Sequence, residues 1–447
     1  MYLKNLPIVL FCLLTSSTLD AQILTSSNLP IVVINTNGSN IPDEPKIDAS
    51  MGIIYNGEGM TNQLSDPFNY YDGNIGIETR GNSTQGFEKK TYSLELRDDN
   101  NEDLSVNLFG MGGEEDWILH AMVIDKSQLR IPMSFYWSQL MGHYASEWRF
   151  VEVVINHEYR GLYILTERIK RDDDRVDIDK LEEEDLSGDE LTGGYILRID
   201  WLEGDAGFES NYDSQGGIPM TFQWYYPKAD NIQTEQADYI QSWMANFEEA
   251  LYANDYTNSQ GIRYDEYIDL DAFVDFLIIN ELSKNADGYK LSSYVYKDKD
   301  SRDGRLIAGP IWDFDQTYGV SEVCSCDDPT GWTYLQNQDD CEDLASMPMW
   351  WRAMMQDTVF QNRLDCRWTD FRSRFLHTDS IHTWIDEHVE LTADAIDRNF
   401  TRWDNFIGEY IWFEPDPVPE SYEEEITYLK DWIDERVQWL DDNFHGN

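Results

Sequence analysis

The sequence predicts an α+β fold with a sheet-rich first half and a mainly helical second half. Residues 75–96 alternate between apolar and polar side chains, as strands with one buried face do. Residues 240–251 and 426–440 instead carry apolar side chains three and four positions apart, which is the spacing of a helix with one buried face. The chain has 447 residues, 41% of them hydrophobic, so it is long and apolar enough to bury a sizeable core.

The first 21 residues have the pattern of an export signal. Lys4 precedes an apolar run at residues 6–14, and small polar residues then lead to a cleavage site after Ala21. The run is too short to cross a bilayer, and no later stretch reaches about 18 uninterrupted apolar residues. We therefore expect a secreted, extracellular protein without a membrane span.

The segments after the signal are expected to form a sheet-rich N-terminal lobe. Residues 22–48 are interpreted as a lead segment with an edge strand at 30–34, and residues 49–230 as the lobe itself. Residues 172–190 hold 11 carboxylates and are interpreted as a flexible acidic insertion. The expected elements are a two-stranded ribbon within 75–96, a helix at 127–141, and strands at 150–155, 161–165 and 194–199.

Residues 231–447 are expected to form a helical C-terminal lobe. Besides the helices at 240–251 and 426–440, apolar residues at 273–277 indicate another helix. Between them, residues 291–297 and 305–311 have the pattern of two strands joined by a turn at Asp303-Gly304. The helical lobe is thus predicted to carry one β-hairpin.

The charge is strongly acidic, with 85 acidic against 33 basic side chains and a formal net charge of −52. A polyanion of this size repels phosphates, so a general basic surface for nucleic acid is excluded. A solvated acidic surface suited to a salty medium is the favoured interpretation of this charge. The alternative is that part of it binds divalent cations or a basic partner.

Four cysteines remain after the signal: Cys324, Cys326, Cys341 and Cys366. We expect them to form two disulfides, because an exported chain meets oxidising conditions. A Cys324–Cys326 bond would be strained by its spacing, which leaves two other pairings open. A zinc site is the alternative interpretation, although no histidine lies among these cysteines.

The predicted hairpin brings two carboxylates together. Asp287 precedes the first strand and Asp313 follows the second, each 13 residues from Asp300 at the turn. Antiparallel strands place their outer ends side by side, so the two side chains should share one end of the hairpin. Such a pair can hold a metal while orienting a nucleophile, can act as a glycosidase pair, or can simply cap turns.

Four blocks, in this order along the chain, carry a resemblance. They are Arg80-Gly-Asn-Ser with Lys89-Lys90-Thr-Tyr, Gly161-Leu-Tyr-Ile-Leu-Thr-Glu167-Arg-Ile-Lys, Asn285-Ala-Asp287-Gly-Tyr and Gly309-Pro-Ile-Trp-Asp313-Phe-Asp315. Together they resemble the CotH kinase family, named for a spore-coat protein, over residues 75–319. The resemblance implies a two-lobed, atypical protein-kinase-like fold. It also implies an enzyme that uses ATP and Mg or Mn to phosphorylate Ser or Thr of a protein acceptor.

The resemblance also implies roles for individual residues. Asp287 matches the catalytic-loop aspartate, which accepts or orients the proton of the acceptor hydroxyl. Asp313 matches the metal-binding aspartate, and Asp315 either adds a second ligand or caps a turn. Lys89 or Lys90 would contact the ATP phosphates, since neighbours on a strand point to opposite faces. Glu167 would pair with that lysine or help hold the metal, and Arg80 would lie near the nucleotide.

One departure from the kinase pattern concerns the second metal ligand. Kinases have an Asn five positions after the catalytic aspartate, and this chain has Ser292 there. Asn285 is the candidate replacement. The alternative function is therefore a catalytically inactive, kinase-like extracellular structural or adhesion protein. A carbohydrate-active hydrolase built on Asp287 and Asp313 is a third hypothesis.

Overall fold

The computed structural model describes residues 23–202, 206–336, 341, 347–404 and 406–444. It contains both helices and sheets, so the α+β prediction is confirmed. The expected export signal and its cleavage site lie outside the described residues. The helices are α1 (Arg130–Met141), α2 (Thr234–Tyr252), α3 (Leu270–Ser283), α4 (Trp350–Met354), α5 (Thr358–Arg372), α6 (Thr378–Arg402) and α7 (Tyr422–Asn443).

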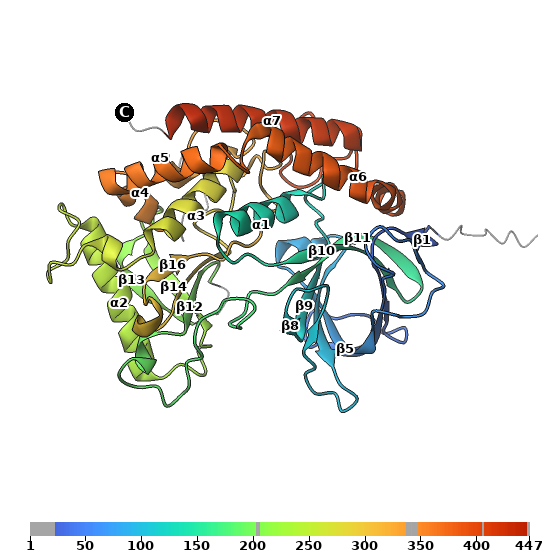
Figure 1. Cartoon of the computed structure of the whole chain (residues 1–447), viewed down its shortest axis with the longest axis horizontal. Coiled ribbons are helices and arrows are strands. Elements are labelled where there is room, and N and C mark those ends of the chain that lie inside the picture. Colours follow the sequence, from blue (N-terminus) through green and yellow to red (C-terminus); the bar gives the residue numbers. More distant parts are fainter. Residues whose placement is uncertain (1–22, 203–205, 337–340, 342–346, 405, 445–447) are drawn as a thin grey trace, which may run out of the picture.

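The strands of the first half close into a barrel (Figure 1). In spatial order they are β10 (Trp148–Ile155), β11 (Glu158–Glu167), β9 (Asp116–His120), β6 (Thr91–Arg97), β5 (Tyr71–Arg80), β3 (Ile47–Ile54) and β2 (Ile31–Asn35). Strand β2 pairs with β3 on one side and runs parallel to β10 on the other. The predicted edge strand at residues 30–34 is therefore wrong, because closure gives this strand a hydrogen-bonded neighbour on both sides.

Strand β11 buries both of its faces over most of its length. On β11, Tyr163 and Leu165 belong to the core inside the barrel, which draws alternate residues from every barrel strand. The intervening Leu162 and Ile164 belong to the core that the barrel shares with the helices. This arrangement explains why residues 161–165 are apolar throughout instead of alternating with polar side chains.

A second sheet carries the predicted hairpin. In spatial order its strands are β13 (Gly207–Asp213), β14 (Pro219–Tyr226), β12 (Tyr195–Ile199), β15 (Ser293–Lys297) and β16 (Leu306–Ala308). Strands β15 and β16 form the hairpin, with Val295 opposite Ala308. Strand β12 pairs with β15, so the sheet joins strands from both sides of residue 230. Two short pairs complete the strands: β1 (Ser26–Ser27) with β4 (Asn62–Gln63), and β7 (Val106–Asn107) with β8 (Gly113–Glu114).

Helices form a layer along one side of the molecule (Figure 1). Helix α6 packs on β11 of the barrel, α7 packs on α3 and α6, and α5 packs on α3. Helix α2 packs on β13 and α4, at the far side of the second sheet. Along α7 the expected stripe is buried, from Ile426 and Leu429 to Leu440. The terminal helix therefore packs into the core, as its spacing predicts.

A glycine sets the contact between α6 and the barrel. Gly161 has φ +108°, and a Cβ there would lie 2.4 Å from Asn399 Oδ1 of α6. That oxygen accepts a hydrogen bond from Leu162 N at 3.1 Å. Nearby, Arg398 of α6 pairs with the buried Glu152 at 2.6 Å. Only glycine combines the left-handed backbone with this close approach.

The acidic run at residues 172–190 contacts the turn of the hairpin. Arg302 pairs with Asp177 and Asp179, at 3.1 and 2.8 Å. Lys299 pairs with Asp179 at 2.8 Å and with Glu190. These ion pairs attach the acidic segment to the second sheet, rather than leaving it to stand apart from the fold.

The cysteines form one disulfide, between Cys324 and Cys341. Cys326 is free and buried, and Cys366 is free and exposed on α5. The expectation of two disulfides is therefore wrong, because Cys366 faces solvent while Cys326 is buried away from it. Within the described residues, no helix is both long and apolar enough to span a bilayer.

Candidate active site

A cavity of about 730 Å³ lies between the barrel and the second sheet. The barrel side includes Arg80 at the end of β5 and Arg168 just after β11. The hairpin contributes Asp287 and Ser292 before β15, and Asp313 and Asp315 after β16. The structure thus places the two aspartates expected to share one end of the hairpin in the same cavity.

Asp313 is held by the segment that precedes β15. Ser292 Oγ donates to Asp313 Oδ2 at 2.7 Å, and both residues have a left-handed backbone, with φ of 43° and 55°. Burial raises the pKa of Asp313, while the Ser292 hydroxyl and the positive charge of Arg80 oppose that rise. A residue other than glycine adopts this left-handed conformation only where its surroundings hold it there. The contacts of the loop therefore fix the position of the Asp313 carboxylate.

Asp315 carries a buried carboxylate whose oxygens can still accept hydrogen bonds or bind a cation. Its side chain is 7% exposed and lines the cavity. Within the described part of the chain, no neighbouring residue donates a hydrogen bond to this carboxylate or forms an ion pair with it. Burial raises its pKa well above the usual value, and the negative charges of Asp313 and Asp287 add to this rise. A buried anion beside two others is stable only with a proton or a cation.

Asp287 is oriented by the loop that follows α3. Asn285 Oδ1 accepts from the backbone N–H of Asp287 at 3.0 Å, and Asn285 Nδ2 donates to Asn280 Oδ1 at 3.3 Å. Gln316 Nε2 donates to Asp287 Oδ2 at 3.4 Å. Asn285 is itself buried and lies behind Asp287, outside the lining of the cavity. Its position suits fixing the Asp287 loop.

Three arginines give the cavity its positive charge. Arg80 lies over the ring of Trp312, 5.6 Å from its centroid, and close enough to Asp313 for the two charges to interact. Burial lowers the pKa of Arg80, and Asp313 partly offsets this effect. Arg168, just after β11, and Arg198 of β12 line the same cavity. Guanidinium groups bind phosphate oxygens through pairs of N–H donors, so this set suits a polyphosphate.

The two candidate lysines lie outside this lining. Both precede β6, which begins at Thr91. Lys89 Nζ is buried and donates to Leu162 O at 2.7 Å and to Gln128 Oε1 at 3.2 Å. Burial lowers the pKa of Lys89 to about 7. Lys90 Nζ donates to Gln85 O, and this hydrogen bond stabilises the loop that follows β5.

Glu167 also lies outside the lining of the cavity. Its Oε2 accepts from Tyr144 Oη at 3.0 Å and from Glu147 N at 2.9 Å, and Arg175 lies 3.8 Å from its Oε1. Burial raises the pKa of Glu167 to about 7, against the effect of these neighbours. Its partners in the structure are thus Tyr144 and Arg175, and neither candidate lysine is among them.

Several of the lining residues were not assigned to the site from the sequence, among them Arg168, Arg198, Asp200 and His120. Arg168 directly follows Glu167 in a quoted block, Arg198 lies on the predicted strand at 194–199, and Asp200 follows that strand. Asp200 has a pKa raised by burial, and the nearby charge of Asp313 adds to it. His120 Nδ1 accepts from Met122 N, and burial with Arg80 and Lys89 nearby lowers its pKa to about 3. The signal in the sequence that could have found these residues was a polar side chain at or near the end of each of these buried strands.

A cluster of three carboxylates elsewhere has a different role. Among the described residues, Glu114, Glu115 and Asp116 are the group whose ligand atoms lie within 4.8 Å of one another. Lys170 Nζ lies between them and pairs with all three, at 2.9, 2.5 and 3.2 Å. This lysine already supplies the positive charge that a metal would bring.

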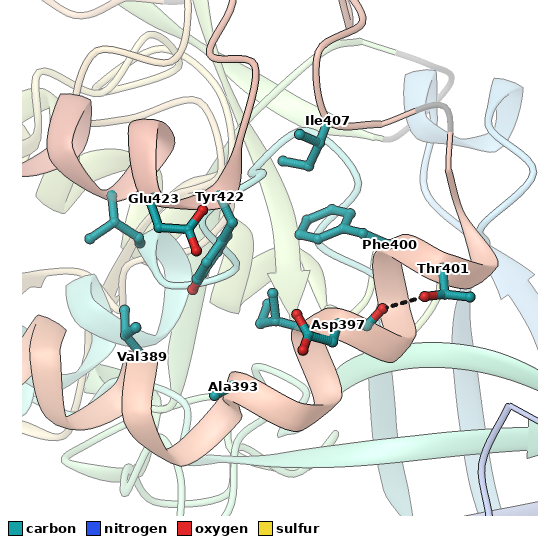
Figure 2. A pocket seen from close by; sticks show the side chains of 10 residues that line it. Val389, Ala393, Asp397, Phe400, Thr401, Ile407, Tyr422 and Glu423 are labelled. Atoms are coloured by element: carbon teal, nitrogen blue, oxygen red, sulfur yellow. Dashed lines mark hydrogen bonds between the residues drawn. The ribbon is translucent and has the colours of Figure 1, made fainter.

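A second large cavity has a volume of about 720 Å³. It lies between α6 and the start of α7 (Figure 2). Its lining is mainly apolar, with Phe400 of α6 and Tyr422 of α7 among its side chains. Asp397 and Glu423 are its carboxylates, and the described residues that line it include no basic side chain. It therefore lacks the groups that would bind phosphates, in contrast to the cavity around Asp313.

Comparison with known proteins gives one family. The family model described as CotH kinase protein matches residues 77–440, which is most of the chain. This range includes Arg80, the aspartates Asp287, Asp313 and Asp315 of the cavity, and nearly all of α7. No curated protein matches the chain.

Proposed function

The chain belongs to the CotH kinase family, and from this premise we propose that it transfers the γ-phosphate of ATP to Ser or Thr of a protein acceptor. We also propose that the reaction needs Mg²⁺ or Mn²⁺ and takes place outside the cell. The supporting observation is the convergence of Asp287, Asp313 and Asp315 with three arginines in one cavity. Phosphoryl transfer depends mainly on positioning and on neutralising charge, and this cavity offers groups for both.

The aspartates of the loop after β16 fit a divalent cation. Asp313 and Asp315 offer carboxylate oxygens, the ligands that Mg²⁺ and Mn²⁺ prefer. The fit rests on Asp315, which is buried without a hydrogen-bonding neighbour in the described chain, beside two further carboxylates. A bound cation would supply the positive charge that neutralises both these carboxylates and the ATP phosphates.

Arg80 is the first candidate for contact with the phosphates. It lines the cavity beside Asp313, and its guanidinium is held over Trp312. Arg168 on the barrel side and Arg198 on the second sheet add two further guanidinium groups to the cavity. In this proposal the arginines take the role that the sequence interpretation gave to Lys89 or Lys90.

Asp287 is the candidate for orienting the acceptor hydroxyl. Its loop is fixed by Asn285, and its carboxylate lines the cavity with those of Asp313 and Asp315. A carboxylate at this position can accept a hydrogen bond from the Ser or Thr hydroxyl and take its proton during transfer. The barrel and the second sheet with its helices would then correspond to the two lobes of a kinase-like fold, with the cavity between them.

The second candidate function is a kinase-like surface protein without catalytic activity. Two observations favour it: neither Lys89 nor Lys90 lines the cavity, and Ser292 stands where kinases have a metal-binding Asn. Such a protein would keep the fold and lose metal-dependent transfer. The two candidates therefore differ in a measurable activity.

A transfer assay tests the proposed function. The mature protein is incubated with γ-labelled ATP, Mn²⁺ and a library of Ser- and Thr-containing peptides, beside the Asp287→Asn variant. The matched control is Asp303→Asn, which removes a carboxylate at the opposite end of the hairpin, where it pairs with Arg305. We expect wild type and control to label peptides and Asp287→Asn to lose at least about a hundredfold in rate. Equal labelling by all three would contradict the role of Asp287.

A further inference from the structure

Helix α7 reaches the loop after β16 through one buried arginine. Arg130 is the first residue of α1, and its side chain is fully buried. Its Nη1 donates to Asp125 Oδ1 at 2.5 Å and to Glu425 Oε1 of α7 at 2.6 Å. Burial alone would lower the pKa of Arg130, but Glu425 and Asp125 raise it above its usual value. The guanidinium therefore stays charged and is held from two sides.

The other nitrogens of Arg130 hold the backbone that follows the metal-binding aspartates. Its Nε donates to Thr317 O at 2.9 Å, and its Nη2 lies 3.4 Å from Tyr318 O. Thr317 comes only two residues after Asp315, so these bonds fix the end of the loop that carries both candidate ligands. The flat guanidinium can serve both carbonyls and both carboxylates at once because its donors point in fixed directions.

A second contact joins α7 to the same loop. Tyr428 Oη donates to Gly319 O at 2.7 Å. Gly319 has φ +82°, and a Cβ there would lie 2.5 Å from the Trp432 ring of α7. Glu425, Tyr428 and Trp432 follow one another at helical spacing, so a single face of α7 covers residues 317–319.

We propose that Arg130 and Glu425 are positioning residues that hold the Asp313–Asp315 loop in its cation-binding arrangement, so that the first half of α7 sets the metal affinity of the cavity. The proposal rests on the proposed function for the identity of the ligand. Glu425 and Arg130 lie outside the lining of the cavity and act through the carbonyls of Thr317 and Tyr318. Without the Glu425 charge, Arg130 keeps Asp125 and Tyr428 keeps Gly319, so the chain should fold while the loop loses its ionic link to α7.

The variants separate positioning from general destabilisation. Glu425→Gln keeps an oxygen facing Arg130 and removes the charge, and Tyr428→Phe removes only the hydroxyl that binds Gly319. Glu423→Gln is the matched control, because Glu423 lies in the same helical turn and its side chain is exposed toward the second cavity. Arg130→Ala is avoided, since it would remove the positive charge that Asp125 and Glu425 share in the core.

Two measurements are made on the full mature chain. Hydrogen–deuterium exchange follows the amides of residues 314–320, and labelled-ATP binding gives the Mn²⁺ concentration at half-saturation. We expect Glu425→Gln to speed exchange in 314–320 and leave the barrel strands unchanged. We also expect it to raise the half-saturating Mn²⁺ concentration about tenfold, since a charge-assisted bond is lost. Tyr428→Phe should also raise the exchange rate in 314–320 and the half-saturating Mn²⁺ concentration, but by smaller amounts. Glu423→Gln should match wild type in both measurements.

The outcomes distinguish this proposal from the proposed function. Unchanged exchange in 314–320, or a lower melting temperature with an unchanged Mn²⁺ requirement, would overturn the positioning role. Failure of wild type to bind ATP at any Mn²⁺ concentration would overturn the proposed function. The exchange comparison would then still decide whether Glu425 holds the loop.

Discussion

Ser292 Oγ donates to Asp313 Oδ2 at 2.7 Å across the open end of the hairpin. Both residues have a left-handed backbone, which costs of order 1–3 kcal/mol for a residue other than glycine. The hydroxyl therefore helps to hold a strained loop that points a carboxylate into the cavity. Ser292 occupies the position where kinases have a metal-binding Asn, and here its visible role is to orient the aspartate.

Removing this hydroxyl should weaken metal-dependent ATP binding. We expect Ser292→Ala to lower the affinity for ATP with Mn²⁺ about tenfold, because Asp313 loses its hydrogen-bond donor. The measurement is equilibrium binding of labelled ATP at fixed Mn²⁺. Ser293→Ala is the control, since Ser293 Oγ donates to Leu291 O. An equal effect of the two variants would refute the role of Ser292.

The arginines, more than the lysines, should determine phosphate affinity. Arg80 lines the cavity, whereas Lys89 is buried against Leu162 O. We therefore expect Arg80→Met to weaken ATP binding by at least about tenfold, and by much more than Lys89→Met does. Titrations with ATP and adenosine check this, because loss of a phosphate contact should spare adenosine. A larger loss in Lys89→Met would return the phosphate role to the lysine.

Glu248 should make stability depend on pH. Burial raises its pKa from 4.5 to about 7, although Ser210 and Trp350 donate to its carboxylate. Since the folded-state pKa lies above the unfolded value, its stabilising contribution is complete below pH 4.5 and is lost as pH rises through 7. Glu248→Gln removes this dependence.

The comparison uses urea unfolding at several pH values. The difference in unfolding free energy between wild type and Glu248→Gln should change by about 3 kcal/mol from pH 4.5 to 7.5. Glu235→Gln, at an exposed position of the same helix, serves as the control. A constant difference across this range would show that Glu248 titrates as an ordinary exposed glutamate.

The disulfide should contribute to stability more than to chemistry. Cys324 and Cys341 are 17 residues apart, and closing a loop of this size stabilises a fold by about 3 kcal/mol. We expect the double variant Cys324→Ser and Cys341→Ser to lose about this much stability in urea while ATP affinity changes less than about twofold. Cys366→Ser, at an exposed free cysteine, is the control. Lost ATP binding with unchanged stability would show that the bond shapes the cavity instead.

The elements that depend on residues close together in the sequence, such as the hairpin and the buried face of α7, could be predicted. The hairpin register follows from neighbouring strands and a turn, so the meeting of Asp287 and Asp313 could be predicted. The apolar stripe of α7 likewise predicted its buried face. Closure of the barrel could not be predicted, because β2 and β10 are more than a hundred residues apart and alternation does not name a partner.

The cations of the cavity were harder to predict than its aspartates. The resemblance implied that Lys89 or Lys90 contacts the phosphates, yet Lys89 is buried and donates to Leu162 O and Gln128 Oε1. Arg198 shares a cavity with Arg80 and Arg168 only because the second sheet faces the barrel. Contacts of this kind depend on how the two sheets pack against each other. The spacing of residues along the sequence does not specify that packing.

The central claim is that Asp313 holds a cation with ATP in this cavity, and calorimetric titration tests it most directly. The protein and its Asp313→Asn variant are titrated with ATP, with and without Mg²⁺ or Mn²⁺. We predict ATP binding by wild type that requires the metal and disappears in the variant. No binding by wild type with either metal, or equal binding by Asp313→Asn, would contradict the account.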